Sequence, residues 1–134
     1  MLISKTDHPH NRNLKFLVIE DDKTVQRTMN FLLPTLFDCE IHLKGNGEEG
    51  ILTATTYLFD LIFVDIDLPG INGIDTADII RKEASGRNNN TPIIAISGNL
   101  GEKQRCFEVG INAFLHKSFS AGDLKETVDS LLYI

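Results

Sequence analysis

The chain alternates, five times along its length, between short apolar runs and segments with apolar residues at helical spacing. The clearest runs, Leu14–Ile19, Leu61–Val64 and Pro92–Ile96, are apolar at nearly every position rather than at every second one. Strands of this kind are buried on both faces, as in a parallel sheet that helices cover on each side. The sequence therefore predicts an α/β fold with a doubly wound parallel sheet and right-handed crossovers.

Weaker signals supply the remaining elements. Two further strands are expected at Cys39–Leu43 and Ile111–Leu115. The expected helices are Lys23–Leu36, Glu48–Phe59, Ile74–Ala84, Glu102–Val109 and Gly122–Leu132. Thr24 is expected to cap the first helix, and Pro34 to end or kink its last turn.

The length of 134 residues fits one domain. Residues 1–13 are polar, lack the apolar stretch of a signal peptide and are expected to form a flexible tail or linker, with the folded domain at 14–134. No apolar run reaches the length of a membrane span, so a cytoplasmic location is expected, either free or as part of a membrane-bound protein. The net charge of −6 argues against a nucleic-acid surface, which needs clustered lysine and arginine.

Cysteine and histidine give no sign of a metal site. Cys39 and Cys106 lie far apart in the sequence and are expected to be buried, reduced thiols. The four histidines show no ligand spacing and are expected to be solvated, with His116 facing away from its neighbour Lys117. These histidines are His8, His10, His42 and His116.

Acids, a hydroxyl and a lysine follow the predicted strands at the edge where an open α/β sheet binds its ligands. The first run leads into Glu20, Asp21 and Asp22, the third into Asp65 and Asp67, the fourth into Ser97, and the fifth into Lys117. Taken singly, such acids can be helix caps, such a serine a turn residue and such a lysine a solvated charge. Four strand ends that carry them to one edge favour a functional site.

This set of side chains suits phosphoryl transfer. Clustered carboxylates repel one another, and a hard divalent cation such as Mg²⁺ relieves that repulsion by taking oxygen ligands. A carboxylate can itself be the nucleophile and form an aspartyl phosphate. A lysine, a hydroxyl and the cation can each stabilise one oxygen of the transferred group.

With these motifs in view, the sequence resembles the receiver domains of response regulators over Leu14 to about Leu132. The segments that carry the resemblance are Phe16–Asp22, Phe59–Gly73, Pro92–Asn99 and Gly110–Lys117. The resemblance implies a three-layer flavodoxin-like fold, with five parallel strands in the order 2-1-3-4-5 and five helices. It also implies a two-component signalling function, in which a histidine kinase or a histidine phosphotransfer protein donates the phosphoryl group.

The resemblance assigns roles residue by residue. Asp65 is implied as the phosphorylated residue, with Ser97 and Lys117 contacting the phosphoryl group. The implied Mg²⁺ ligands, which Mn²⁺ could also use, are Asp65, Asp21 directly, Glu20 through water and Asp67 through its backbone carbonyl. Gly98 is implied to keep the phosphoryl path open. Ser97 and Phe114 are implied switch residues that alter the face made by the fourth helix, fifth strand and fifth helix.

Two positions depart from the family pattern. Ser118 stands where receivers usually have a proline preceded by a cis peptide bond, so the Lys117–Ser118 peptide is either cis at a cost of about 2.5–4 kcal/mol or trans with a rearranged loop. Phe114 cannot donate the hydrogen bond that a tyrosine would. Asp67 and Asn99 lie next to the expected phosphoryl site and bear on the lifetime of the phosphoryl group.

Asn99, Cys106 and Gly110, with the segments around them, look most like receivers attached to hybrid histidine kinases. The chain is therefore expected to be a stand-alone receiver or a piece of such a larger protein. A receiver promotes only its own phosphorylation and dephosphorylation, so the chain is not expected to be a turnover enzyme.

Other functions stay open at this point. A degenerate receiver that only binds partners is an alternative because of Ser118. A haloacid-dehalogenase-like phosphatase would fit Asp65-Ile66-Asp67, but its acid pair comes last in the chain, whereas Glu20 and Asp21 come first here. A flavin-binding flavodoxin is disfavoured, because the acidic segment after the first strand has the wrong charge for a phosphate loop.

Overall fold

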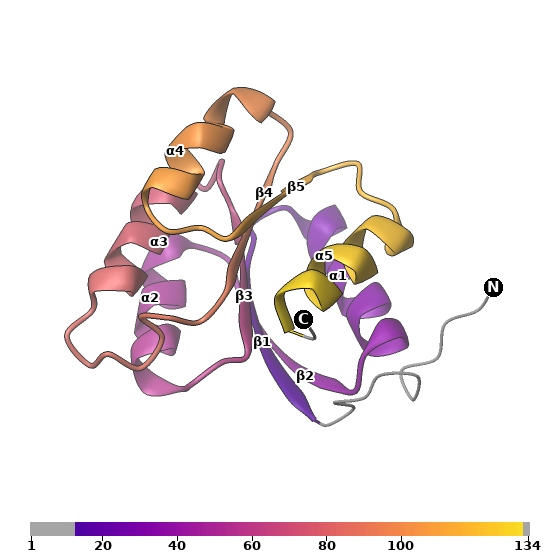
Figure 1. Ribbon diagram of the computed structural model, residues 1–134, viewed down its shortest axis with the longest axis horizontal. Coiled ribbons are helices and arrows are strands. Elements are labelled where there is room, and N and C mark those ends of the chain that lie inside the picture. The colour runs from indigo at the N-terminus through magenta and orange to yellow at the C-terminus, as the bar shows by residue number, and fades with distance from the viewer. Residues whose placement is uncertain (1–12, 133–134) are drawn as a thin grey trace.

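The structure, a computed structural model, describes residues 13–132 (Figure 1). The predicted tail therefore lies outside the described residues, apart from Asn13. Five parallel strands form one sheet in the order β2-β1-β3-β4-β5. The predicted strand order, parallel direction and flavodoxin-like architecture are confirmed.

The elements follow one another in strict alternation. The strands are β1 (Leu14–Ile19), β2 (Cys39–Lys44), β3 (Leu61–Asp65), β4 (Ile93–Ser97) and β5 (Ala113–His116). The helices are α1 (Lys23–Leu36), α2 (Gly47–Thr56), α3 (Gly73–Lys82), α4 (Lys103–Glu108) and α5 (Ala121–Leu132). A short 3₁₀ turn, η2 (Leu100–Glu102), leads into α4.

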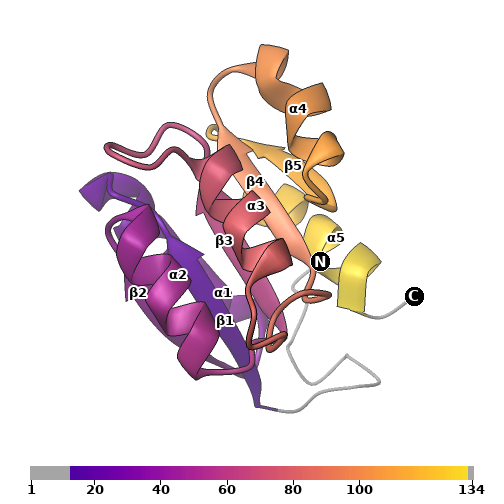
Figure 2. The same cartoon turned by 90° about the vertical axis from the view of Figure 1, so that its left-hand side faces the viewer.

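The sheet separates two apolar cores. Helices α1 and α5 cover one face, and α2, α3 and α4 cover the other (Figures 1 and 2). Along β1, Phe16 and Val18 pack toward α1 and α5, while Leu17 and Ile19 pack toward α2 and α3. Burial on both faces explains why the strand sequences do not alternate between apolar and polar residues. Each fully buried large apolar side chain contributes roughly 1.5–3 kcal/mol of stability.

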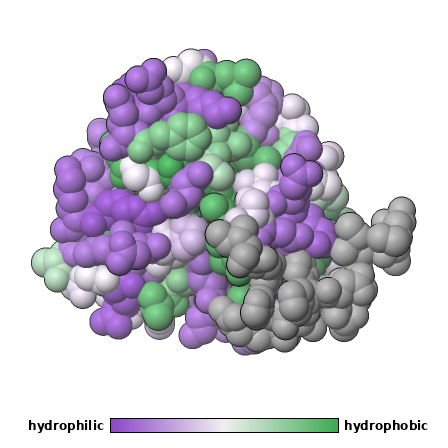
Figure 3. Space-filling view, in the orientation of Figure 1, coloured by the Kyte–Doolittle hydropathy of each residue, from purple (hydrophilic) through white to green (hydrophobic). Residues whose placement is uncertain are grey.

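The outer surface keeps the polar side chains. In the view of Figure 3, hydrophilic residues dominate the visible face, and the hydrophobic ones form separate spots. Between residues 13 and 132, no helix combines the length and the apolar character needed to cross a bilayer.

Helix starts differ from the sequence prediction because side chains cap them. Asp22, not Thr24, caps α1, since its Oδ1 accepts hydrogen bonds from Thr24 N at 2.8 Å and Val25 N at 3.4 Å. Asn46 and Asn72 cap α2 and α3 and start each helix one residue earlier than predicted. Pro34 lies inside α1, which continues for two residues beyond it.

Four elements are shorter than predicted because backbone groups find other partners. Helix α2 ends at Thr56, and the N–H of Phe59 then donates to the buried side chain of Asn88 at 3.0 Å. Helix α4 begins only after η2. Strand β5 begins at Ala113, because Ile111 N donates to Cys106 O and closes the turn after α4. Helix α3 likewise ends at Lys82, where the N–H of Glu83 donates to Ile80 O.

Two predictions about single side chains were wrong. Cys39 is only half-buried, although Cys106 is fully buried as expected, and both are reduced thiols outside any disulfide. His42 is not simply solvated, since its Nε2 lies 2.7 Å from Glu40 Oε2 and its ring packs edge-on against Phe59. The His42 ring also lies 5.4 Å from the ring of Tyr57, the residue directly after α2.

Replacing Gly73 by alanine should destabilise the fold, because α3 begins directly against the end of β3. A Cβ at this position would overlap the carbonyl oxygen of Asp65 and lie 2.7 Å from Ile66 Cα. Backbone atoms cannot move aside cheaply, so we expect Gly73→Ala to lower the unfolding free energy by about 1–3 kcal/mol. Urea denaturation measures the change.

Gly45→Ala is the matched control, because a Cβ at Gly45 would meet no atom within 4 Å and the residue has no positive φ. Its effect should stay within about 0.5 kcal/mol. Equal unfolding free energies for the two variants would contradict the close packing of α3 on β3.

Candidate functional site

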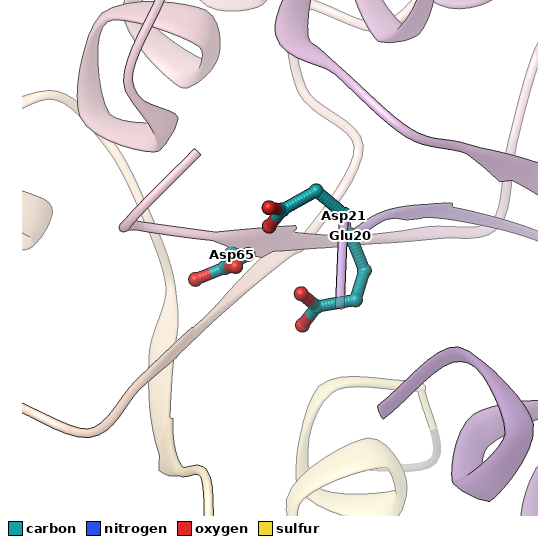
Figure 4. Close-up of side chains that lie close together, drawn as sticks. All are labelled: Glu20, Asp21 and Asp65. Carbon is teal, nitrogen blue, oxygen red and sulfur yellow. The ribbon is translucent and has the colours of Figure 1, made fainter. Parts of the chain in front are cut away.

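Three carboxylates converge at the carboxyl ends of two neighbouring strands. Glu20 and Asp21 follow β1, and Asp65 is the last residue of β3 (Figure 4). Ile19 pairs with Val64, so the two strands end at the same level of the sheet. One carboxylate oxygen from each of the three residues lies within 4.8 Å of the others.

Glu20 is a buried carboxyl group with an unmet hydrogen-bonding need. Its Oε2 accepts a hydrogen bond from Asp22 N at 3.1 Å, whereas Oε1 is buried and has no partner among the described residues. Burial, followed by the hydrogen bond with Asp65 and the charge of that residue, raises the pKa of Glu20 to about 8. Without a cation, Glu20 is therefore largely protonated at neutral pH.

Asp65 is fully buried and held from two sides. Its Oδ1 accepts a hydrogen bond from Asp67 N at 2.9 Å, and its Oδ2 lies 3.4 Å from Lys117 Nζ. Asp21 is exposed, and partial desolvation, together with a hydrogen bond to Asp65 and the charge of Asp65, raises its pKa. Asp65 therefore raises the affinity of both Glu20 and Asp21 for a proton, and the cluster favours a bound cation.

Lys117 is the cation that the described residues supply to this site. Its backbone N–H donates to Ser97 O at 3.0 Å, which ties the end of β5 to the end of β4. Burial alone would lower the pKa of Lys117, but the charges of Asp65 and Glu20 raise it, so the ammonium stays protonated. One ammonium cannot neutralise both Asp21 and Asp65, so the site keeps a negative excess even while Glu20 is protonated.

The donor set fits a hard divalent cation. Mg²⁺ prefers oxygen ligands and uses one or two carboxylates together with other oxygens. The partnerless Oε1 of Glu20 and the mutual repulsion of Glu20, Asp21 and Asp65 are the features that such an ion would relieve. Asp67 lies in the turn directly after β3 with its side chain exposed, so its contribution through the backbone carbonyl stays a prediction.

The predicted hydroxyl lies at the same edge but is directed elsewhere. Ser97 is fully buried at the end of β4, next to β3. Its Oγ accepts a hydrogen bond from Asn99 N at 3.0 Å and lies 3.4 Å from Asn99 O. Ser97 would have to turn its hydroxyl away from Asn99 to reach a group bound at Asp65.

Gly98 and Phe114 occupy the places that the sequence predicted. Gly98 is exposed, and a Cβ added there would meet no atom within 4 Å. Phe114 is half-buried in β5 and packs against the core between the sheet and α2, α3 and α4. Their roles in access and switching stay predictions.

The Lys117–Ser118 peptide is trans, since the described chain contains no cis peptide bond. Of the two alternatives that the sequence left open, the trans loop is therefore the one observed. Lys117 still reaches Asp65 with Ser118 in the following position.

Sequence reasoning missed the residues that fix the backbone around the carboxylates. The buried amide of Gln26 donates to Glu20 O at 2.6 Å from the first turn of α1. Its signal was a polar residue on the inner face of that helix, one turn after the Asp22 cap. Gly73 is a second such residue, because it lets α3 approach Asp65 O closely.

Comparisons with known proteins agree with this geometry. Residues 16–129 match the response regulator receiver domain family. Hybrid signal transduction histidine kinase G of Dictyostelium discoideum is 33% identical over 121 residues, which are 88% of this chain and 4% of that protein. Chemotaxis protein CheY-3 of Vibrio cholerae is 30% identical over 127 residues, which are 90% of this chain and 93% of that protein. The chain thus spans a small part of the kinase and nearly all of the chemotaxis protein.

A solved structure shares the fold. The receiver domain of sensor histidine kinase PA1611 from Pseudomonas aeruginosa superposes with a TM-score of 0.80 at 26% identity, covering 90% of this chain and 98% of that one. That structure is described as having a magnesium ion coordinated in its active-site cleft.

The unusual protonation of Glu20 should make stability and Mg²⁺ affinity depend on pH. Folding raises the pKa of Glu20 from about 4.5 to about 8, so the folded state holds the proton more tightly than the unfolded state does. The stability that this proton provides is lost as pH rises between those two values. Without Mg²⁺, we expect the unfolding free energy to fall over this range, by at most about 1.4 kcal/mol per pH unit for one proton. Mg²⁺ should bind more tightly as pH rises toward 8, since it competes with that proton. Thermal unfolding and calorimetric titration measure both effects.

Glu20→Gln is the matched variant, because glutamine keeps the side-chain shape and cannot ionise. It should flatten the pH dependence of stability between pH 5 and 8 and weaken Mg²⁺ binding. Glu40→Gln is the control at an exposed acid remote from the site, and it should leave the affinity for Mg²⁺ unchanged. A wild-type Mg²⁺ affinity that falls as pH rises would contradict the assignment of Glu20.

Proposed function

This chain belongs to the response regulator receiver family, and we propose that Asp65 accepts a phosphoryl group from a phosphohistidine in a reaction that requires Mg²⁺. The observation that carries the proposal is the setting of Asp65. It is buried, it faces Lys117 Nζ at 3.4 Å, and it lies within 4.8 Å of oxygens of Glu20 and Asp21. A carboxylate so placed is both a nucleophile and a cation ligand.

The residues that would hold the cation are Asp21 and Asp65 directly, Glu20 through water and Asp67 through its backbone carbonyl. When bound, the ion neutralises charge that develops on the phosphoryl oxygens during transfer. The magnesium ion described in the cleft of the Pseudomonas aeruginosa receiver supports this assignment. Mn²⁺ accepts the same oxygen ligands and should substitute.

The chain's own groups perform the remaining steps. A carboxylate oxygen of Asp65 attacks the phosphorus, the bond from phosphorus to the donor imidazole nitrogen breaks, and an acyl phosphate forms on Asp65. Lys117 already faces Oδ2 of Asp65 and would pair with a phosphoryl oxygen after transfer. The exposed position of Gly98 leaves space at the edge of the site.

The output follows from the change of charge at Asp65. The Ser97 hydroxyl would leave Asn99 and donate to a phosphoryl oxygen. Phe114, half-buried on the neighbouring edge strand, would then turn inward and alter the face formed by α4, β5 and α5. This is a shift between two populations, biased by a local charge.

The phosphoryl donor is a histidine kinase or a histidine phosphotransfer protein. The hybrid kinase among the relatives supports this pairing, and the net charge of −6 disfavours direct binding to nucleic acid. We expect residues 14–134 to act as one receiver domain in the cytoplasm, where such donors would meet it. The domain catalyses only its own phosphorylation and dephosphorylation.

The alternatives lack a supporting observation. Ser118, which motivated the degenerate receiver, leaves Lys117 within 3.4 Å of Asp65. A haloacid-dehalogenase-like phosphatase would carry its nucleophile on the first core strand, whereas Asp65 ends β3.

Acetyl phosphate with Mg²⁺ should add one phosphoryl group to Asp65. Intact-mass spectrometry should show the adduct, and a chelator should abolish it. Asp65→Asn should give no adduct, and Lys117→Ala should slow its formation by about 10²–10³-fold, because one charge-stabilising contact is lost.

Asp22→Asn is the matched control, since asparagine also caps a helix and Asp22 lies one position beyond the acid pair. It should form the adduct at the wild-type rate. An adduct of equal yield in Asp65→Asn would exclude Asp65 as the acceptor.

A further inference from the structure

The turn that carries Lys117 leaves the sheet into solvent. Lys117 N donates to Ser97 O at the end of β4, and after it Ser118 and Ser120 are exposed. Lysine has a long, flexible side chain, so the position of its ammonium depends on how firmly this turn is held.

His116 closes the turn with both its backbone and its side chain. Its carbonyl oxygen accepts a hydrogen bond from Phe119 N at 3.0 Å. Its imidazole Nδ1 accepts a hydrogen bond from Ser118 N at 3.1 Å and lies 2.7 Å from Ser118 Oγ. The two residues that flank Lys117 are thereby tied to each other across it.

The geometry fixes the form of the imidazole. A backbone N–H can only donate, so Nδ1 must be the acceptor nitrogen, and the proton of the neutral ring lies on Nε2. The ring thus performs the task of a side-chain acceptor that bonds the backbone two residues further on, as asparagine does in many turns. The prediction that His116 points away from the lysine side chain agrees with its exposed position.

The far end of the turn is held separately. Ser120 and Asp123 cap α5 reciprocally, with Ser120 N donating to Asp123 Oδ2 and Asp123 N donating to Ser120 Oγ, both at 3.0 Å. The lysine end of the turn therefore relies on His116 and on the single bond to Ser97 O.

We infer that His116 is a positioning residue that holds Lys117 against Asp65 by accepting the Ser118 N–H through Nδ1. The inference rests on the proposed function only for its effect on phosphoryl transfer. Without the Nδ1 acceptor, Ser118 N–H can bond to water, so the fold persists. The peptide between Lys117 and Ser118 then gains rotational freedom, and the ammonium spends less time at 3.4 Å from Asp65.

Chemical labelling of Lys117 tests the positioning without any phosphoryl chemistry. An amine-reactive acetylating reagent, followed by peptide mass spectrometry, measures how often the Lys117 side chain leaves Asp65 and loses its proton, since only the neutral amine reacts. His116→Ala should raise the labelling rate of Lys117 by about fivefold, since the ion pair opens more often. His116→Asn should restore the wild-type rate, because its Oδ1 stands where Nδ1 stood, whereas His116→Gln, with its acceptor one bond further out, should not.

His42→Ala is the matched control, since it removes a histidine from β2 and leaves the turn after β5 untouched. It should not change the labelling of Lys117. Equal labelling in wild type, His116→Ala and His116→Asn would overturn the inference.

Phosphorylation kinetics give the functional readout. His116→Ala should lower the maximal rate with acetyl phosphate by about tenfold, because misplacing a catalytic group slows the reaction. Its Kd for Mg²⁺ should stay within about twofold, because the proposed cation ligands lie at the ends of β1 and β3 rather than β5, and its Tm should not change. A merely structural role would instead lower Tm and leave the maximal rate of the folded protein intact, which would refute positioning. A wild type that takes up no phosphoryl group would refute the proposed function, while the labelling series would still decide the role of His116.

Discussion

The excess of carboxylate charge at the ends of β1 and β3 is the constraint on which this site depends. Parallel strands end at one edge, and the level ends of β1 and β3 bring Glu20, Asp21 and Asp65 together. Lys117 and the backbone N–H groups of Asp67 and Asp22 offset part of this repulsion, and burial together with Asp65 raises the pKa of Glu20 to about 8. These partners leave one buried carboxyl oxygen of Glu20 unpaired, and a divalent cation is the group that best completes the set.

The surroundings of the carboxylates combine rigid and movable parts. Gln26 fixes the backbone of Glu20, and Gly73 lets α3 rest directly on the backbone of Asp65. Ser97 and Lys117 depend on local contacts that can rearrange. Ser97 Oγ accepts a hydrogen bond from Asn99 N, and the turn after Lys117 is closed by the hydrogen bond from Ser118 N to His116 Nδ1. In the proposed function, the rigid part binds and reacts, while the movable part registers the new charge at Asp65.

Much of this arrangement could be predicted from the sequence. Strands buried on both faces leave apolar runs that are easily recognised, and the topology of a parallel sheet then forces their polar end residues to one edge. The residues that cap helices were predicted less well, since Asp22 could be either a site acid or a cap, and only the hydrogen bonds to Thr24 N and Val25 N decide. The start of β5 was missed because Asn112 and Ile111 bond outside the regular ladder. The hydrogen bond from Ser118 N to His116 Nδ1 depends on the orientation of the imidazole ring, which no pattern of residue types specifies.

The negative excess around Asp65 should create a site for a cation and a phosphoryl group together. A crystal structure with Mg²⁺ and beryllofluoride, which mimics a phosphoryl group on aspartate, tests it most directly. We expect beryllofluoride on a carboxylate oxygen of Asp65, contacted by Lys117 Nζ and Ser97 Oγ, with the cation against Asp21. Density for both ions at another place, with Glu20 and Lys117 unchanged, would exclude Asp65 as the centre of a combined cation and phosphoryl site.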